Sequence, residues 1–170
     1  MRVSITVDRF MEAVSDYKVS IIAGKEGVNN IIEWFHMAEN MFEIDHINEK
    51  ELVFSSGEKL DDEHHFMQFL EKLIDRKSSG LVIAYGYYLK CISEKVKKFC
   101  NEKSFPLMMV TYSVNISNIT KLLSIQLLES EKINRQLFSA MKNAISFPEK
   151  MEGYLPTLLQ YGFKKMSHIL

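Results

Sequence analysis

The chain of 170 residues has little of several features that would place it in a particular class of protein. It contains two cysteines, Cys91 and Cys100, and three prolines. Two thiols are too few for a disulfide framework, which agrees with a reducing cytoplasm. No apolar run approaches the ~20 residues that a membrane-spanning helix requires, and the N-terminus lacks the apolar segment of a secretory signal. We therefore expect a cytoplasmic protein that does not enter a membrane.

The sequence also lacks an excess of charge of either sign. Twenty-one Lys and Arg residues against 22 Asp and Glu residues give a net charge of −1. Such a balance does not indicate a surface for nucleic acid or for an anionic membrane. Hydrophobic residues make up 46% of the chain, which excludes a disordered protein. The length suits one domain, or one domain with an attached segment.

Motifs for common catalytic chemistry are absent as well. His64 and His65 are adjacent, so on a helix they project ~100° apart and cannot share a metal ion. The two cysteines lie nine positions apart, outside the spacing of metal ligands. There is no nucleophile elbow, Walker loop or dinucleotide-binding fingerprint. We predict no metal, no cofactor and no catalytic residue.

Hydrophobic periodicity indicates an α/β protein. A helical pattern at 7–14 is followed by β-rich runs at 19–22 and 31–36. From Leu52 onward, apolar strands alternate with amphipathic helices, in the order 52–54, 61–77, 81–84, 93–102, 106–110 and 117–145. Two consecutive βαβ units of this kind build a predominantly parallel sheet with helices over it.

The last of these helices, at 117–145, is much longer than the ~11–12 residues of an average globular helix. Its first half is expected to cover one face of the sheet. The remainder is either a dimer seam or a rigid connector to a further domain. We predict a homodimer formed through Ile133, Leu137 and neighbouring residues.

Polar loops follow the three strands from Leu52 onward. They read Ser55-Ser56-Gly57, Tyr85-Gly86-Tyr87 and Thr111-Tyr112-Ser113. Ligands of parallel sheets bind beyond the carboxyl ends of the strands, and glycine lets a backbone come close to a bound group. The alternative is that these residues only make strand-to-helix turns.

A second candidate region is the polar and aromatic stretch from Glu33 to Glu39. Strand alternation sends Trp34 and His36 to one face, where the indole can stack on a planar ligand and His36 or Glu39 can bind its polar edge. The alternative is a packed indole beside a hydrogen-bonded histidine. The predicted ligand-binding set combines both regions: Trp34, His36, Glu39, Ser55, Ser56, Gly57, Tyr85 and Gly86.

Two stretches resemble a known family. Residues 32–39, Ile-Glu-Trp-Phe-His-Met-Ala-Glu, are similar to the V-R-W-V-H-V-S-E of the N-terminal domain of PucR-type purine catabolism regulators. Residues 51–57, Glu-Leu-Val-Phe-Ser-Ser-Gly, resemble that family's G-E-L-V-L-T-T-G. The resemblance spans residues 3–128 in the family's order. Two positions depart from it: Glu33 stands where the family has Arg, and Lys50 where it has Gly.

The resemblance implies a bacterial sensor domain at 1–128 that binds a small-molecule effector. Residues 129–170 are then a helical connector at the start of a downstream region. Relatives carry a helix-turn-helix domain far downstream, so DNA is expected to be bound only through a domain absent from this sequence. The function implied is effector sensing and dimerisation in a transcriptional regulator of purine or related nitrogen-compound catabolism, without enzymatic activity. The alternative is a small α/β enzyme that acts on a nucleobase-like or phosphorylated metabolite, with His36 and Glu39 as acid and base.

Overall fold

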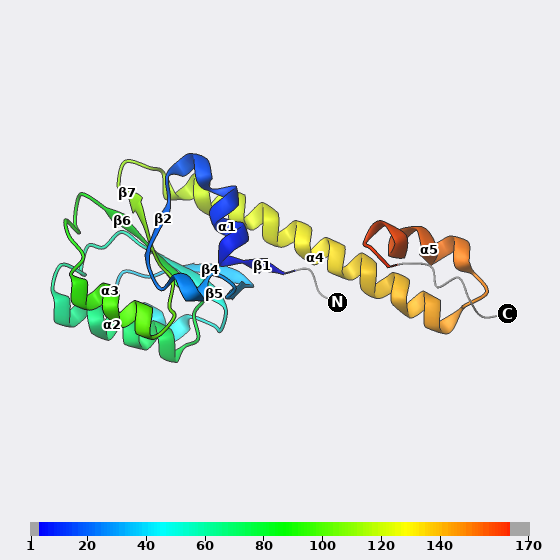
Figure 1. Cartoon of the computed structure of the whole chain (residues 1–170), viewed down its shortest axis with the longest axis horizontal. Helices are drawn as coiled ribbons and strands as arrows, with labels where there is room; N and C mark the ends of the chain where they lie inside the picture. Colours follow the sequence, from blue (N-terminus) through cyan, green and yellow to red (C-terminus); the bar gives the residue numbers. More distant parts are fainter. Residues whose placement is uncertain (1–3, 164–170) are drawn as a thin grey trace. The chain divides into compact units, whose positions relative to one another are not determined.

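The computed structural model describes residues 4–163, which fall into two compact units (Figure 1). The first unit is Ser4–Leu127 and the second begins at Leu128. The elements in chain order are β1 (Ile5–Thr6), α1 (Val7–Ala13), η1 (Ser15–Tyr17), β2 (Ser20–Ala23), η2 (Lys25–Gly27), β3 (Ile31–Ile32), β4 (Trp34–Met37), η3 (Glu43–His46), β5 (Glu51–Ser55), α2 (Glu63–Asp75), β6 (Gly80–Tyr85), α3 (Glu94–Glu102), β7 (Leu107–Thr111), α4 (Ile116–Ser146) and α5 (Met151–Gln160).

A five-stranded sheet organises the first unit, with strand order β2-β7-β6-β5-β4. Strands β4, β5, β6 and β7 are parallel to one another, and β2 pairs antiparallel with β7 at one edge. The predicted α/β class, the predominantly parallel sheet and the long C-terminal helix are therefore confirmed.

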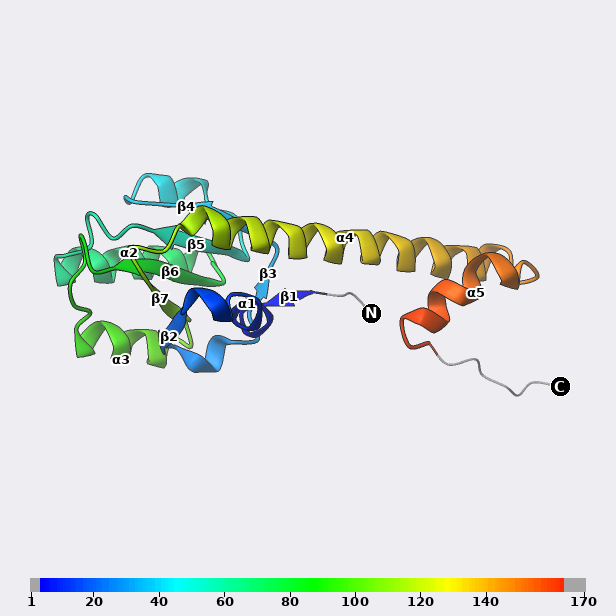
Figure 2. The same cartoon turned by 90° about the horizontal axis from the view of Figure 1, so that it is seen from above.

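Helices cover both faces of this sheet (Figure 1, Figure 2). Along β5, Val53 faces the core formed with α2 and α3, while Leu52 and Phe54 face the core formed with α1 and the first turns of α4. Strands that are buried on both faces need no polar alternation. This explains why β5 is buried along its whole length and β6 is buried up to Tyr85.

Side-chain caps fix most of the helix starts. Thr6, Asp62 and Ser93 each accept a hydrogen bond from the backbone N–H three residues later, at the N-termini of α1, α2 and α3. At the start of α4, Asn115 Oδ1 accepts a hydrogen bond from the N–H of Ser117 at 2.9 Å.

The β-rich run predicted at 31–36 is two strands. Ile32 of β3 pairs with Ile5 of β1 in a separate antiparallel ribbon, whereas β4 joins the main sheet beside β5. Strand pairing switches from β1 to β5 at Glu33, whose N–H donates to the carbonyl of Lys50 at 2.9 Å.

In the second unit, α5 folds back along the last part of α4 to form a helical hairpin (Figure 2). Tyr161 Oη and Gln136 Oε1 join the two helices at 3.2 Å. Leu137 is only 2% exposed, so it cannot form the exposed dimer seam that was predicted there. Ile133, the other residue named for this seam, is half-buried.

Candidate functional site

The carboxyl ends of β5, β6 and β7 meet at one edge of the sheet. Their pairing is in register, with Ser55 opposite Ile83 and Tyr85 opposite Thr111. The loops that follow these strands therefore lie at the edge where parallel sheets bind ligands. We call these loops, together with Glu39 after β4, the carboxyl edge.

Glu39 fixes the loop after β5. Its carboxylate accepts hydrogen bonds from Ser55 Oγ at 2.9 Å, from the Ser56 N–H at 2.7 Å and from Ser56 Oγ at 2.9 Å. The Gly57 N–H in turn donates to Ser55 Oγ at 3.1 Å. Four of the predicted ligand-binding residues are thus brought together, and they satisfy one another's hydrogen-bonding groups.

A second carboxylate supports this network. Glu43 Oε2 accepts from the N–H of Glu39 at 2.5 Å, and this hydrogen bond is the largest cause that lowers the pKa of Glu43. The backbone at Glu39 is therefore held from η3, while its side chain holds the loop after β5.

Gly57 is required by the packing of the loop. Its φ is +79°, and a Cβ built there would lie 3.1 Å from Leu89 Cβ and 3.4 Å from the carbonyl oxygen of Ala84. The missing side chain therefore leaves room for the protein's own core rather than for a ligand.

Three exposed tyrosines gather at the same edge. The rings of Tyr87 and Tyr112 are stacked, with centroids 4.8 Å apart, and Tyr88 meets both of them edge-on. Their position follows from the backbone, because the Tyr112 N–H donates to the carbonyl of Tyr85 at 2.8 Å and the Gly86 N–H to that of Leu89 at 2.9 Å. We call these three rings the tyrosine cluster.

The predicted set includes Tyr85 and Gly86 but none of the clustered rings. A signal for them was present in the loops Tyr85-Gly86-Tyr87-Tyr88 and Thr111-Tyr112, which end neighbouring strands. The cluster also lies near an acidic group, since the charge of Glu58 is the largest cause that raises the pKa of Tyr88.

The structure does not bring Trp34 to the carboxyl edge. Trp34 begins β4 and pairs in register with Glu51, the first residue of β5, whereas Ser55 is the last. Four residues along a strand span ~13 Å. The indole is 42% exposed and stacks on the ring of Phe35 at a centroid distance of 5.4 Å. The single site predicted from both regions is therefore divided between two ends of the sheet.

His36 pairs in register with Val53, in the middle of β5, and its side chain reaches toward the other end of that strand. Its Nδ1 lies 3.4 Å from Oε2 of Glu51, a residue that is only 7% exposed. Asn48 donates to the same carboxylate through its N–H at 3.1 Å and through Nδ2 at 3.0 Å. The two groups of the alternative acid–base pair, His36 and Glu39, thus contact different partners.

The two departures from the family motifs contact each other. Lys50 Nζ lies 3.0 Å from Glu33 Oε1, and Lys50 adopts a left-handed backbone with φ +63°. Glycine is favoured in that conformation, which explains the Gly of the family's pattern. A shallow hollow of about 410 Å³ lies nearby, lined by Asn29, Asn30, Ile31, Lys50, Lys77, Ser78 and Ser79.

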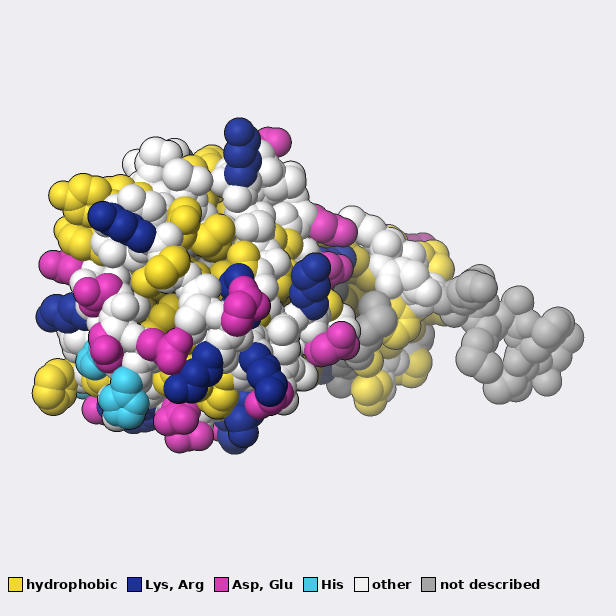
Figure 3. Space-filling model, turned by 60° about the vertical axis from the view of Figure 1, so that its left-hand side comes forward, with side chains coloured by type: hydrophobic (Ala, Val, Ile, Leu, Met, Phe, Trp, Pro, Cys, Tyr) yellow, Lys and Arg dark blue, Asp and Glu magenta, His cyan; other side chains and the backbone are white. Residues whose placement is uncertain are grey.

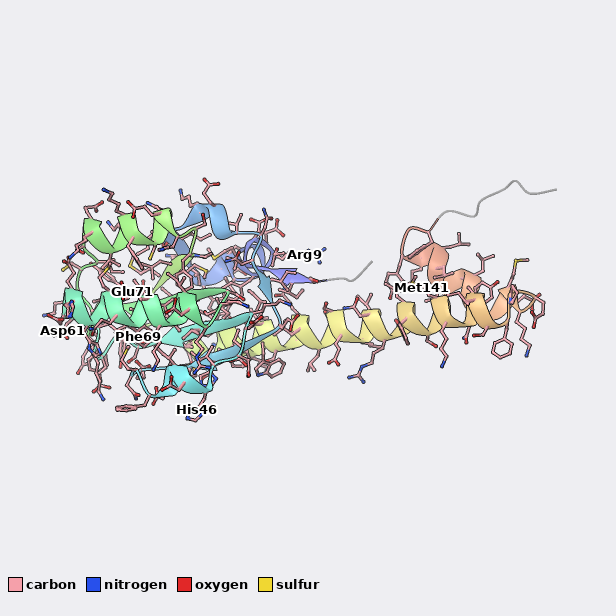
Figure 4. All side chains as sticks on the ribbon, turned by 90° about the horizontal axis from the view of Figure 1, so that it is seen from below. Arg9, His46, Asp61, Phe69, Glu71 and Met141 are labelled. Atoms are coloured by element: carbon pink, nitrogen blue, oxygen red, sulfur yellow. The ribbon has the colours of Figure 1, made fainter. Side chains whose placement is uncertain are left out.

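Residues 4–163 contain no group of three or more His, Cys, Asp or Glu side chains placed to hold a metal ion. His46, for example, is exposed on η3 (Figure 4). Within the same described residues, no helix is long and apolar enough to span a bilayer.

Comparison with known families identifies the family of the chain. The sequence model of the Purine catabolism regulatory protein-like family, PucR, matches residues 11–127, which is more than half of the chain. The chain belongs to this family. Its family assignment therefore confirms the resemblance, and it supports a regulatory role in transcription and purine catabolism. No curated protein and no solved structure matches the chain. The matched PucR segment ends at Leu127, and all the residues of the carboxyl edge lie within it.

Proposed function

We propose that the chain is an effector-sensing domain of a transcriptional regulator of purine or related nitrogen-compound catabolism, and that the effector binds at the carboxyl edge. The observation that carries this proposal is the tyrosine cluster, whose rings remain 61%, 37% and 43% exposed for Tyr87, Tyr88 and Tyr112. Aromatic side chains in contact with water offer a face on which a planar ligand can stack.

In this proposal some residues of the carboxyl edge hold the loops in place and others contact the effector. Glu39, Ser55, Ser56 and Gly57 hold the loop after β5 in one conformation through the hydrogen bonds described above. Tyr85 and Gly86 belong to the turn that carries Tyr87 and Tyr88. In this proposal the tyrosine rings contact the planar part of the effector, and their hydroxyls bind its polar edge.

The same edge offers a route for the signal. Tyr112 lies four residues before Ile116, the first residue of α4, and the intervening turn is closed by the Val114 N–H, which donates to the carbonyl of Thr111 at 2.9 Å. A ligand that moves Tyr112 therefore acts on a short, hydrogen-bonded segment that leads directly into α4. If the effector binds one conformation of this segment more tightly than another, effector binding is coupled to the start of α4.

The chain acts without catalysis in this proposal and reaches DNA through another domain. On the face of the molecule in Figure 3, Lys and Arg side chains are interspersed with Asp and Glu side chains, so no continuous basic patch is visible there. His36 and Glu39, the pair that the enzymatic alternative requires, are engaged with Glu51 and with the two serines.

A thermal-shift screen with purine bases and their ring-opened derivatives tests the proposal. A ligand at 100 times its Kd stabilises the folded state by ~2.7 kcal/mol. We expect such a shift for the wild type, its loss in Tyr112→Ala and Tyr87→Ala, and its retention in Trp34→Phe. Chromatography of the ligand after incubation should recover it unchanged. Conversion of the ligand, or a shift lost only in Trp34→Phe, would overturn the proposal.

A further inference from the structure

The α4–α5 hairpin carries large apolar side chains on its outside. Phe138 is 72% exposed and Ile145 is 81% exposed, although both lie on a helix that buries Leu137. On α5, Met151 and Leu159 are about half exposed. Side chains of this size are normally the ones that a folded unit buries first.

A polar hollow lies between the two helices on one side of the hairpin. This hollow has a volume of about 260 Å³ and is lined by Gln136, Ser139, Ala140 and Asn143 of α4 and by Gly153, Thr157 and Gln160 of α5. Most of these lining residues are exposed, whereas Leu137, Ala140 and Tyr154 of the hairpin are buried. The hollow therefore marks a polar side of the hairpin.

Helix geometry places the exposed apolar residues of α4 away from this hollow. Phe138, Met141 and Ile145 each follow a lining residue by two positions, which is a rotation of ~200° about the helix axis. They share one stripe because they are spaced three and four residues apart. Met141 lies alongside α5 in Figure 4, at the border of the stripe.

The same offset occurs in α5. Met151 and Leu155 precede Gly153 and Thr157 by two positions, and Leu159 continues their stripe one turn later. Both stripes therefore lie on the side of the hairpin turned away from the hollow. We call this side the apolar face of the hairpin, made up of Phe138, Met141, Ile145, Met151, Leu155 and Leu159.

We propose that the apolar face of the hairpin packs against the same face of a second copy of this chain, so that four helices enclose a common core. A pair of helices forms a single layer, and helical bundles close a core when two such layers meet. The α4 stripe suits a two-fold axis near Met141, which brings Phe138 of each chain next to Ile145 of the other.

The amount of exposed surface fits a dimer of modest affinity. Five exposed side chains and the half-buried Leu155 give an apolar face on the order of 600 Å², so a dimer would bury ~1,200 Å², the lower limit of stable interfaces. The charges around the face are of both signs: Glu131 and Arg135 pair at 2.6 Å, and Lys150 is next but one to Glu152. Two copies can therefore associate without strong electrostatic repulsion. A partner with a large net charge of one sign would meet no complementary charge around this face.

Sedimentation of the full chain at a series of concentrations tests this pairing. We expect a reversible change from one to two chain masses in the micromolar range. The double variant Phe138→Glu/Ile145→Glu should weaken association on the order of 100-fold, and Ser139→Glu, on the hollow, should leave it unchanged. A wild type that stays monomeric at several hundred micromolar, or equal effects of both variants, would overturn the proposal.

Cross-linking provides a second readout, with substitutions that add no charge to the hairpin. In a Cys91→Ser background, Met141→Cys should form chain-to-chain links with a short bismaleimide, and Ser139→Cys should not. Equal yields at the two positions would contradict the proposed face. A chain that dimerises only after removal of residues 164–170 would assign the face to that segment instead, and would also contradict the proposal.

Discussion

Glu33 and Lys50, the two residues that depart from the PucR motifs, form an ion pair with Nζ and Oε1 3.0 Å apart. Glu33 precedes β4 and Lys50 precedes β5, so the pair joins the starts of two adjacent parallel strands. Two substitutions that look independent in the sequence are thus neighbours in the fold. The charge reversal at Glu33 is matched by a new cation, far from the carboxyl edge.

Lys50→Gly should be more stable than Lys50→Ala by ~1 kcal/mol, because Lys50 has φ +63° and only glycine adopts this conformation without strain. Both variants lose the exposed ion pair, so this loss cancels in the comparison. At Lys98, an exposed position in α3, the order should reverse, because glycine destabilises a helix relative to alanine. Urea unfolding of the four variants measures both differences. Equal stabilities at position 50 would contradict the assigned backbone strain.

Glu39→Ala should destabilise the protein by ~2–4 kcal/mol. The carboxylate accepts from both serine hydroxyls and from the Ser56 N–H, and its removal leaves buried Ser55 without this acceptor. The matched control is Glu49→Ala, which breaks an exposed pair with Lys77 and should change stability far less. Similar losses for the two variants in urea unfolding would mean that the Glu39 network does not stabilise the loop.

Much of the fold could be predicted from the sequence because its signals are local. The uninterrupted apolar run Leu81–Ala84 is typical of a strand buried on both faces, and β6 is such a strand. Thr6, Asp62 and Ser93 cap their helices through hydrogen bonds to residues three positions away. Contacts of this range are visible in the sequence.

The candidate site could be predicted only in part because it depends on strand register. The order of residues puts Trp34 near Glu39, but only the pairing of Trp34 with Glu51 shows that the indole lies at the opposite end from Ser55. Alternation along a strand gives the face of a residue and not its level in the sheet. The burial of Leu137 is a similar case, because the helical pattern alone does not show which apolar positions of α4 are buried.

The two thiols should differ strongly in reactivity. Burial raises the pKa of Cys100 to about 12, whereas Cys91 is exposed. Only the thiolate reacts with Ellman's reagent. At pH 8 we therefore expect one fast equivalent from the native protein and a second equivalent after addition of denaturant. Cys91→Ser should abolish the fast phase. A second fast equivalent in the native wild type would show that the core around Cys100 opens readily.

Gly57→Ala and Gly153→Ala should change stability in opposite directions. At Gly57 the φ of +79° and the 3.1 Å approach to Leu89 Cβ combine backbone strain with crowding, and we expect a loss of ~1–3 kcal/mol. At Gly153, within α5, a Cβ meets nothing within 4 Å, so alanine should stabilise the helix by ~0.5–1 kcal/mol. Chemical unfolding, followed by circular dichroism, measures both changes. Because the Cβ at position 57 points into the protein's own core, effector binding by Gly57→Ala should persist at temperatures where the variant is folded. A folded Gly57→Ala protein that has lost all effector binding would instead place the ligand directly against this glycine.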